Sequence, residues 1–180
     1  HFGPDGLVAV SGTDEEDGDQ VKIWRWATNE VIAELSLSGS EVISFDASGS
    51  RIAVDSDDTT VWDVRTGRLL ATLPSSQERP YDIAFSPDGS RLAEMDPDGT
   101  VRLFDAGSGE EVLVLDGHDE GGQIAFSPDG SMLATVGGGM ARIWALDIDD
   151  LLEIARENVT RSLTDEECRQ YIHTEACSSP

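Results

Sequence analysis

Two stretches decide the fold: Phe85-Ser86-Pro87-Asp88-Gly89 and Phe126-Ser127-Pro128-Asp129-Gly130. Each follows Ile-Ala, and the alternation Ile-Ala-Phe is typical of a half-buried β-strand. In each turn proline presets the backbone at the first position, aspartate (Asp88, Asp129) caps its own backbone, and glycine (Gly89, Gly130) adopts the left-handed conformation. Both stretches therefore predict a strand, a tight turn and a second strand.

The same pattern recurs along the chain. Phe2-Gly3-Pro4-Asp5-Gly6 and Phe45-Asp46-Ala47-Ser48-Gly49 are weaker copies, so a phenylalanine recurs every 40 to 43 residues. A second aromatic series, with a spacing of 38 to 42 residues, consists of Trp24, Trp62, Phe104 and Trp144. Two independent series with one period indicate an internal structural repeat.

Each repeat is expected to hold up to four short strands. The expected first strands are 43–45, 83–85 and 124–126, and the second strands are 7–10, 51–54, 91–94 and 132–135. The expected third strands are 21–24, 60–62, 101–104 and 141–144, and the fourth strands are 31–35, 69–73 and 112–115. Asn29, Gly67 and Gly109 supply the left-handed position between the third and fourth strands. Four short strands in about 40 residues are typical of a β-propeller blade, so we expect an all-β fold.

The repeats resemble those of WD-repeat β-propellers. Trp62-Asp63 is the signature dipeptide of that family, Phe104-Asp105 is a close variant, and Trp24 stands at the corresponding place in the first repeat. Gly117-His118, eight residues before Phe126, matches the family's Gly-His. The resemblance covers residues 2 to about 146, and it implies blades of four antiparallel strands that serve as a platform for protein partners.

The resemblance also implies a buried hydrogen-bonded tetrad in each blade, made by a His, a Ser or Thr, an Asp and a Trp. In the last repeat the matching residues are His118, Thr135 and Trp144. Gly137–Gly139 occupies the turn in which the Asp should stand. The third repeat has Asp98 but carries Glu94 and Phe104, and no His precedes it. We therefore expect no blade to hold the full network.

The count of repeats bears on the domain organisation. Closed propellers have 4 to 8 blades, whereas residues 1–146 make about four repeats, of which the first lacks its leading strand and the last its closing strand. We expect a C-terminal part of a larger ring, with further N-terminal blades in cis. The alternative is a four-repeat protein that closes as a small ring or pairs with another chain.

Residues 147–180 form a second expected segment, a short helical hairpin. Residues 149–158 have helical spacing, and Thr164-Asp165-Glu166-Glu167 matches a capping box that opens a helix to about residue 173. Cys168 and Cys177 could pair, bind a metal with outside ligands, or do neither. The tail resembles those of actinobacterial-type WD-repeat proteins, in which the propeller is often joined to a STAND-class ATPase or a transcriptional-activator module.

Charge narrows the class of partner. Acidic residues outnumber basic ones 36 to 12, for a formal net charge of −24. Phosphate binding needs clustered Lys and Arg, so we expect no nucleic-acid contact and no binding to an anionic membrane. Acidic connections between strands, such as 55–58, 96–98 and 117–122, would favour a basic protein partner by steering, although ordinary solvating charge explains them too.

The sequence offers no catalytic constellation. It has no Gly-x-Ser-x-Gly, phosphate loop, Gly-x-Gly-x-x-Gly or His-Glu-x-x-His. A calcium loop over Asp14–Asp19 would place Thr13 and Trp24 at the first and twelfth ligand positions, and neither suits the ion. We expect no catalytic residue, metal or cofactor in this segment.

Three hypotheses about function follow. The first is a cytoplasmic, non-enzymatic interaction or scaffold module, the sensing or scaffolding arm of a bacterial multidomain signalling or transcription regulator. The second is the C-terminal part of a STAND-type ATPase or another enzyme whose active domain lies upstream. The third, a propeller enzyme, lacks any convergent polar site.

Overall fold

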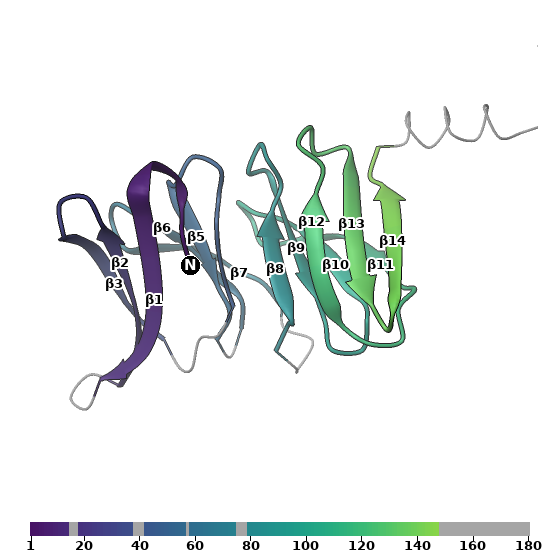
Figure 1. Ribbon diagram of the computed structural model, residues 1–180, viewed down its shortest axis with the longest axis horizontal. Coiled ribbons are helices and arrows are strands. Elements are labelled where there is room, and N and C mark those ends of the chain that lie inside the picture. The colour runs from purple at the N-terminus through teal and green to yellow at the C-terminus, as the bar shows by residue number, and fades with distance from the viewer. Residues whose placement is uncertain (15–17, 38–41, 57, 75–78, 148–180) are drawn as a thin grey trace, which may run out of the picture. The chain divides into compact units, whose positions relative to one another are not determined.

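The computed structural model describes residues 1–14, 18–37, 42–56, 58–74 and 79–147. The chain divides into two units, His1–Trp144 and Ala145–Pro180. The first unit contains four antiparallel sheets, which we call A to D in chain order (Figure 1). The expected helical hairpin, Cys168 and Cys177 lie outside the described residues. Within the described ranges no helix is long and apolar enough to cross a membrane.

Each sheet is built from consecutive strands. Sheet A contains β1 (Leu7–Asp14), β2 (Gly18–Arg25) and β3 (Glu30–Ser36). Sheet B contains β4 (Ile43–Phe45), β5 (Arg51–Val54), β6 (Thr60–Asp63) and β7 (Arg68–Thr72). Sheet C contains β8 (Asp82–Phe85), β9 (Arg91–Met95), β10 (Val101–Asp105) and β11 (Glu111–Leu115). Sheet D contains β12 (Gly122–Phe126), β13 (Met132–Gly137) and β14 (Met140–Ala145). The prediction of an all-β fold of antiparallel sheets is confirmed: sheets B and C have four strands, whereas sheets A and D, the first and last repeats, have three.

Residues 1 and 2 also pair with the first strand of sheet A. Phe2 forms an antiparallel bridge with Val8, and the amide of Ala9 donates to the carbonyl of His1 over 2.9 Å. The short 3-10 turn η1 (Pro4–Gly6) then leads into β1.

The turns follow from local chemistry. Gly49, Gly89 and Gly130 all have φ near +70°, which is the left-handed region that glycine tolerates best. At the other end of sheet D, Gly138 and Gly139 both have positive φ, as a two-residue hairpin turn of type I′ requires. In sheets A, B and C the register shifts by one residue next to Trp24, Trp62 and Phe104 respectively. The repeats therefore share their irregularities as well as their strands.

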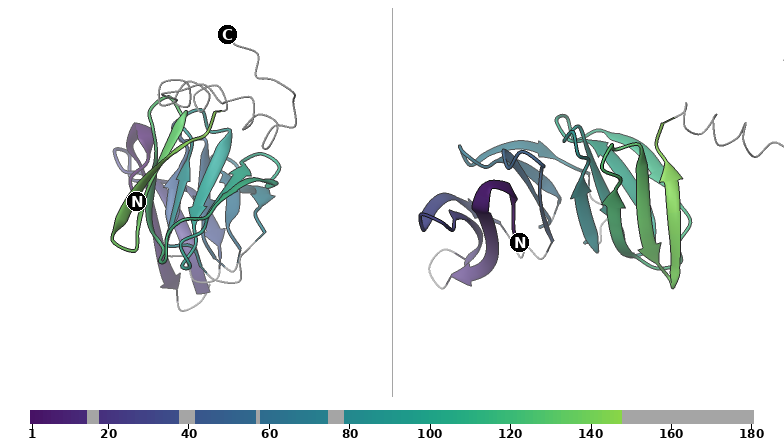
Figure 2. Two further views of the ribbon diagram at one scale, coloured as in Figure 1. Left: turned by 90° about the vertical axis from the view of Figure 1, so that its right-hand side faces the viewer. Right: turned by 45° about the horizontal axis from the view of Figure 1, so that its top comes forward.

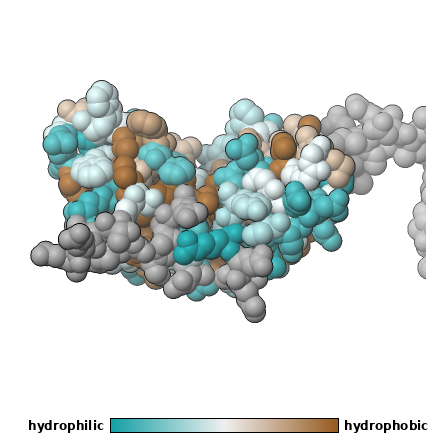
Figure 3. Space-filling model, turned by 60° about the horizontal axis from the view of Figure 1, so that its bottom comes forward, coloured by the Kyte–Doolittle hydropathy of each residue, from teal (hydrophilic) through white to brown (hydrophobic). Residues whose placement is uncertain are grey.

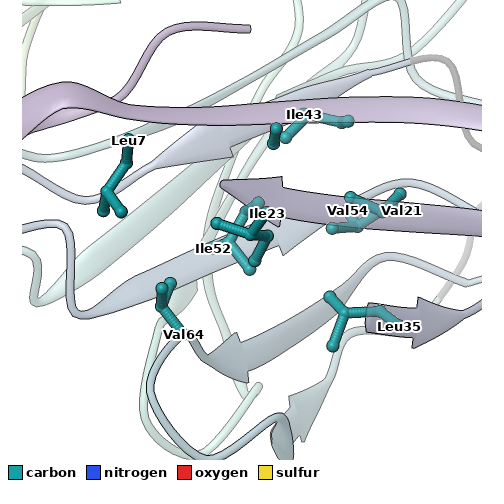
Figure 4. Close-up of a cluster of buried hydrophobic side chains, with 9 residues drawn as sticks. Leu7, Val21, Ile23, Leu35, Ile43, Ile52, Val54 and Val64 are labelled. Atoms are coloured by element: carbon teal, nitrogen blue, oxygen red, sulfur yellow. The ribbon is translucent and has the colours of Figure 1, made fainter. Parts of the chain in front are cut away.

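Figures 1 and 2 show how the strands of each sheet lie side by side. Hydrophobic side chains pack between sheets A and B and between sheets B and C. Between sheets A and B the buried cluster contains Leu7, Ala9, Val21, Ile23, Leu35, Ile43, Ile52, Val54 and Val64 (Figure 4). Between sheets B and C it contains Ala53, Val61, Ala71, Leu73, Ile83, Phe85, Leu92, Phe104 and Ala106. The hydrophobic face of one sheet covers the hydrophobic face of the next. Each hydrophobic cluster is therefore made by two consecutive repeats.

Candidate functional site

A pocket of about 560 Å³ lies between sheets C and D, at the end of the strands where β9 turns into β10 and β11 leads into β12. It is lined by Tyr81, Pro97, Glu120, Gly121, Gly122 and Gln123. The structure thus brings together two of the acidic connections that we expected to favour a basic partner, 96–98 and 117–122. Connections are where a rigid sheet scaffold usually carries its function.

Backbone hydrogen bonds fix the walls of this pocket. The amide of Tyr81 donates to the carbonyl of Met95 over 2.7 Å. The amide of Gly121 donates to the carbonyl of Pro97 over 2.9 Å. Gly121 must be a glycine, because a Cβ there would collide with the ring of Tyr81 and the carbonyl of Asp96. At Gly121 the connection 117–122 therefore approaches residues 96 and 97 with bare backbone.

Asp82 ties the inner strands of sheets C and D together. Its Oδ2 accepts a hydrogen bond from the amide of Ile124 over 3.0 Å, and its Oδ1 accepts one from its neighbour Ile83 over the same distance. Burial raises the pKa of Asp82, although both amides oppose that shift. A side chain from one repeat thereby holds the first strand of the next beside the pocket.

The surroundings of the pocket are acidic and carry one large aromatic side chain. Four exposed acids lie in the connections that form or approach it: Asp98, Asp116, Asp119 and Glu120. Three Arg lie near these connections: Arg79 is two residues before Tyr81, Arg102 donates to Asp96, and Arg142 lies against Gly117. The side chain of Tyr81 is 60% exposed. An aromatic face beside carboxylates suits a cationic side chain, through cation–π attraction and ion pairing.

A buried polar cluster supports the connection 117–122 from below. His118 Nδ1 lies 3.0 Å from the carbonyl of Gly137, and its Nε2 lies 2.7 Å from Oγ1 of Thr135. Trp144 Nε1 donates to the same hydroxyl over 2.9 Å. Because a carbonyl only accepts, Nδ1 is a ring nitrogen that carries a proton and donates to Gly137. The Gly137 carbonyl stands in the turn where the resemblance places an Asp.

The other aromatic signature residues occupy different environments. Trp62 Nε1 donates to Thr60 Oγ1 over 2.8 Å, and that hydroxyl donates to the carbonyl of Val54 over 3.2 Å. Phe104 is fully buried between sheets B and C. Trp24 pairs with Val8 and is half-buried, on the opposite face of sheet A from its core residues.

The aspartates of the signature dipeptides lie at the opposite end of the sheets from the pocket. Asp63 Oδ1 accepts from the amide and the hydroxyl of Thr66, over 2.7 and 2.6 Å. Asp105 Oδ1 accepts from the amides of Gly107 and Ser108, over 3.0 and 2.8 Å. These hydrogen bonds lower the pKa of both carboxyls, so ionised aspartate stabilises the turn to the outer strand.

The remaining predicted residues also serve turns. Asp88 accepts from the hydroxyl of Ser86 over 2.6 Å, and Asp129 accepts from the hydroxyl of Ser127 over 2.6 Å. Such bonds lower the pKa of each carboxyl to about 2. Asp98 is exposed and accepts from the amide of Thr100 over 2.9 Å, so it caps the β9–β10 turn. The structure does not bring Asp98 into a network with a His and a Trp.

Sequence reasoning missed several residues. Thr60 gave a signal, since it stands two residues before Trp62 on the same strand face. Tyr81 and Asp82 gave none, because their roles depend on contact between two repeats. In the part of the chain that the structure describes, no group of three or more His, Cys, Asp or Glu could hold a metal ion. Residues 15–17 of the acidic stretch Asp14–Asp19 lie outside the described residues.

Comparison with known families identifies the repeats. Residues 67–105 and 109–145 match the model of the WD domain, G-beta repeat. These ranges include every strand of sheets C and D, the Phe104-Asp105 signature and the His118 cluster. These repeats are therefore similar to WD repeats.

Among curated proteins, the chain is similar to WD repeat-containing protein VIP3 of Arabidopsis thaliana, with 31% identity over 64% of this chain and 41% of that one. It is 31% identical to human WD repeat-containing protein 36 over 58% of this chain and 12% of that one. It is 43% identical to WD repeat and SOCS box-containing protein 1 of Xenopus tropicalis over 58% of this chain and 25% of that one. The chain spans less than half the length of these relatives, which are all eukaryotic.

Proposed function

We propose that this chain is a non-enzymatic protein-interaction module that binds a basic segment of a partner protein at the pocket between sheets C and D. WD-repeat relatives support an interaction or scaffold role. The observation that carries the finer proposal is the pocket itself, whose lining includes both the exposed Tyr81 and the exposed acid Glu120. A guanidinium or ammonium group there would contact both an aromatic face and a carboxylate.

Electrostatics supports a basic partner in two ways. The formal net charge of −24 gives the chain a negative field that speeds the approach of cations. The exposed acids around the pocket then set where the partner settles. Figure 3 shows one face of the molecule, on which hydrophilic side chains are interspersed with smaller hydrophobic areas. Such a mixed surface favours a polar contact with local anchors over a broad hydrophobic interface.

The test is the affinity for a short fluorescent peptide that carries several Arg between Gly and Ser, measured by fluorescence polarisation. The matched probe replaces each Arg with citrulline, which keeps the shape and removes the charge. We expect Tyr81→Ala and Glu120→Gln each to weaken binding about two- to five-fold. Glu110→Gln is the control, because Glu110 is an exposed acid at the opposite end of sheet C.

Two results would overturn this proposal. One is equal affinity for the arginine and citrulline peptides. The other is an equal loss from Glu110→Gln and Glu120→Gln, which would show a diffuse effect of net charge with no defined pocket.

The wider proposal is that the module belongs to a bacterial multidomain signalling or transcription regulator, with further blades and an ATPase or another active domain upstream. Its support is the sequence of the tail, residues 147–180; the eukaryotic relatives lend it none. The gene sequence upstream of His1 tests it: an in-frame STAND-type ATPase would support it, and a nearby stop codon would refute it.

A further inference from the structure

Glu94 is a buried acid at a position where the next repeat has a neutral hydroxyl. In sheet C, Glu94 pairs with Ile83, and in sheet D, Thr135 pairs with Ile124. The two positions are therefore equivalent. Thr135 serves His118 and Trp144, whereas sheet C offers Phe104 in the place of Trp144. The side chain of Glu94, only 4% exposed, thus lacks the donors that the repeat pattern would supply.

The surroundings of Glu94 come from both sheets. From sheet B, Thr59 forms a side-chain hydrogen bond with it, and Asp55, which is 1% exposed, lies close enough to raise its pKa. From sheet C, Asp96 is 2% exposed and acts in the same direction. Glu94 Oε1 is buried and has no hydrogen-bond partner among the described residues. Asp55, Asp96 and the unsatisfied Oε1 of Glu94 are therefore all buried near the contact between sheets B and C.

Arg102 faces this cluster, but other acids already engage its guanidinium. Arg102, opposite Glu94 on β10, donates from Nε to Asp96 over 2.9 Å and from Nη1 to Glu111 over 3.2 Å. Its favourable effect on Glu94 is the smallest of the contributions, and the largest is burial. Together these effects raise the pKa of Glu94 to about 7. The surroundings of Glu94 thus keep its carboxyl protonated and uncharged below about pH 7.

We propose that the contact between sheets B and C is a proton-dependent junction, which is tight while Glu94 carries a proton and loosens when Glu94 ionises. An ionised Glu94 would repel Asp55 across the junction and Asp96 within its own sheet. Its buried Oε1 would also require water, which can enter only if the sheets separate locally. The hydrophobic side chains that flank the site, Ile83 and Phe104, gain nothing from that water.

The direction of the pH effect follows from proton linkage. An acid whose pKa is raised by folding binds more protons in the folded chain than in the unfolded one. This contribution to stability is therefore complete below the ordinary glutamate pKa of 4.5, and it is lost as the pH rises through about 7. We expect the folding equilibrium constant to lose on the order of 100-fold from this group between pH 4.5 and pH 8.

The experiment has a direct and an energetic part. The side-chain carboxyl ¹³C shift of Glu94 is followed against pH in the whole chain, and we expect its midpoint near 7. Denaturant unfolding is then compared for the wild type, Glu94→Gln and Glu94→Thr, with Glu110→Gln as an exposed control in the same sheet. We expect Gln to match the wild type at pH 5 and to raise the folding constant on the order of 100-fold at pH 8.

The outcomes are separable. A ¹³C midpoint near 4.5 would overturn the proposal, whatever the variants do. A Gln variant that keeps the wild-type pH dependence between 5 and 8 would do the same. If Glu94→Gln fails to fold, Glu94→Thr provides the same comparison with the hydroxyl that sheet D uses. Neither part requires a partner, so the result is independent of the peptide-binding proposal.

Discussion

Replacing Phe85 by alanine should cost far more stability than replacing Phe126, although both belong to the same sequence motif. The two residues are equivalent in register, since Phe85 pairs with Leu92 and Phe126 with Leu133. Phe85 is only 9% exposed and packs into the B–C cluster. Phe126 is half-buried. The motif is the same, but the burial differs.

The magnitude follows from that burial. Removing a buried phenylalanine loses its transfer free energy and leaves a cavity, which together cost about 3–5 kcal/mol. Phe85→Ala also removes the ring face over which the Arg51 guanidinium lies, 5.4 Å from the centroid. For Phe126 we expect about 1–2 kcal/mol, a fraction of full burial. The two variants should therefore differ by roughly 2 kcal/mol or more.

The assay is denaturant unfolding of the three proteins in parallel at fixed pH. A loss of stability moves the midpoint while the slope with denaturant concentration stays constant. Equal losses for the two variants would refute the argument from burial. A loss below about 1.5 kcal/mol for Phe85→Ala would show that the B–C cluster does not behave as a packed core.

Three further predictions concern the turns and the polar cluster. Thr135→Val keeps the side-chain shape but removes the hydroxyl shared by His118 and Trp144, so it should cost about 1–3 kcal/mol in chemical denaturation; an unchanged midpoint would count against the cluster. Gly99→Ala should destabilise the chain by about 1–3 kcal/mol, because φ is +87° there and a Cβ would meet the carbonyl of His118. Thermal unfolding measures this loss, and Gly12→Ala is the control because a Cβ at Gly12 meets nothing within 4 Å. Because hydrogen bonds lower the pKa of Asp88 to about 2, its contribution to the turn should persist above pH 3.8 and vanish as the pH falls through about 2; a carboxyl ¹³C titration with a midpoint near 3.8 would contradict this.

The strands and turns could be predicted from sequence because their causes are local. The Ile-x-Phe alternation and the Ser-Pro-Asp-Gly turns need no distant partner, and Gly89 and Gly130 have the expected positive φ. Asn29, Gly67 and Gly109 likewise have positive φ before the outer strands. Each of these features depends on neighbours within a few residues.

What could not be predicted depends on contact between repeats. The sequence marked Glu94 as a departure from the family pattern, but only the structure shows that Asp55 of the preceding repeat lies beside it. The same holds for the pocket, whose walls come from residues 81 and 97 of one repeat and 120–123 of the next. The unequal burial of Phe85 and Phe126 is a third case, since their local sequences are identical.

The measurement that tests the central claim most directly is a backbone NMR titration of the ¹⁵N-labelled chain with the arginine peptide. We expect the largest amide shifts at Tyr81, Gly121, Gly122 and Gln123, and no comparable shifts at Gly67 and Gly109 at the opposite end of the sheets. Shifts that spread evenly over the acidic surface, or that gather at Gly67 and Gly109, would contradict the account.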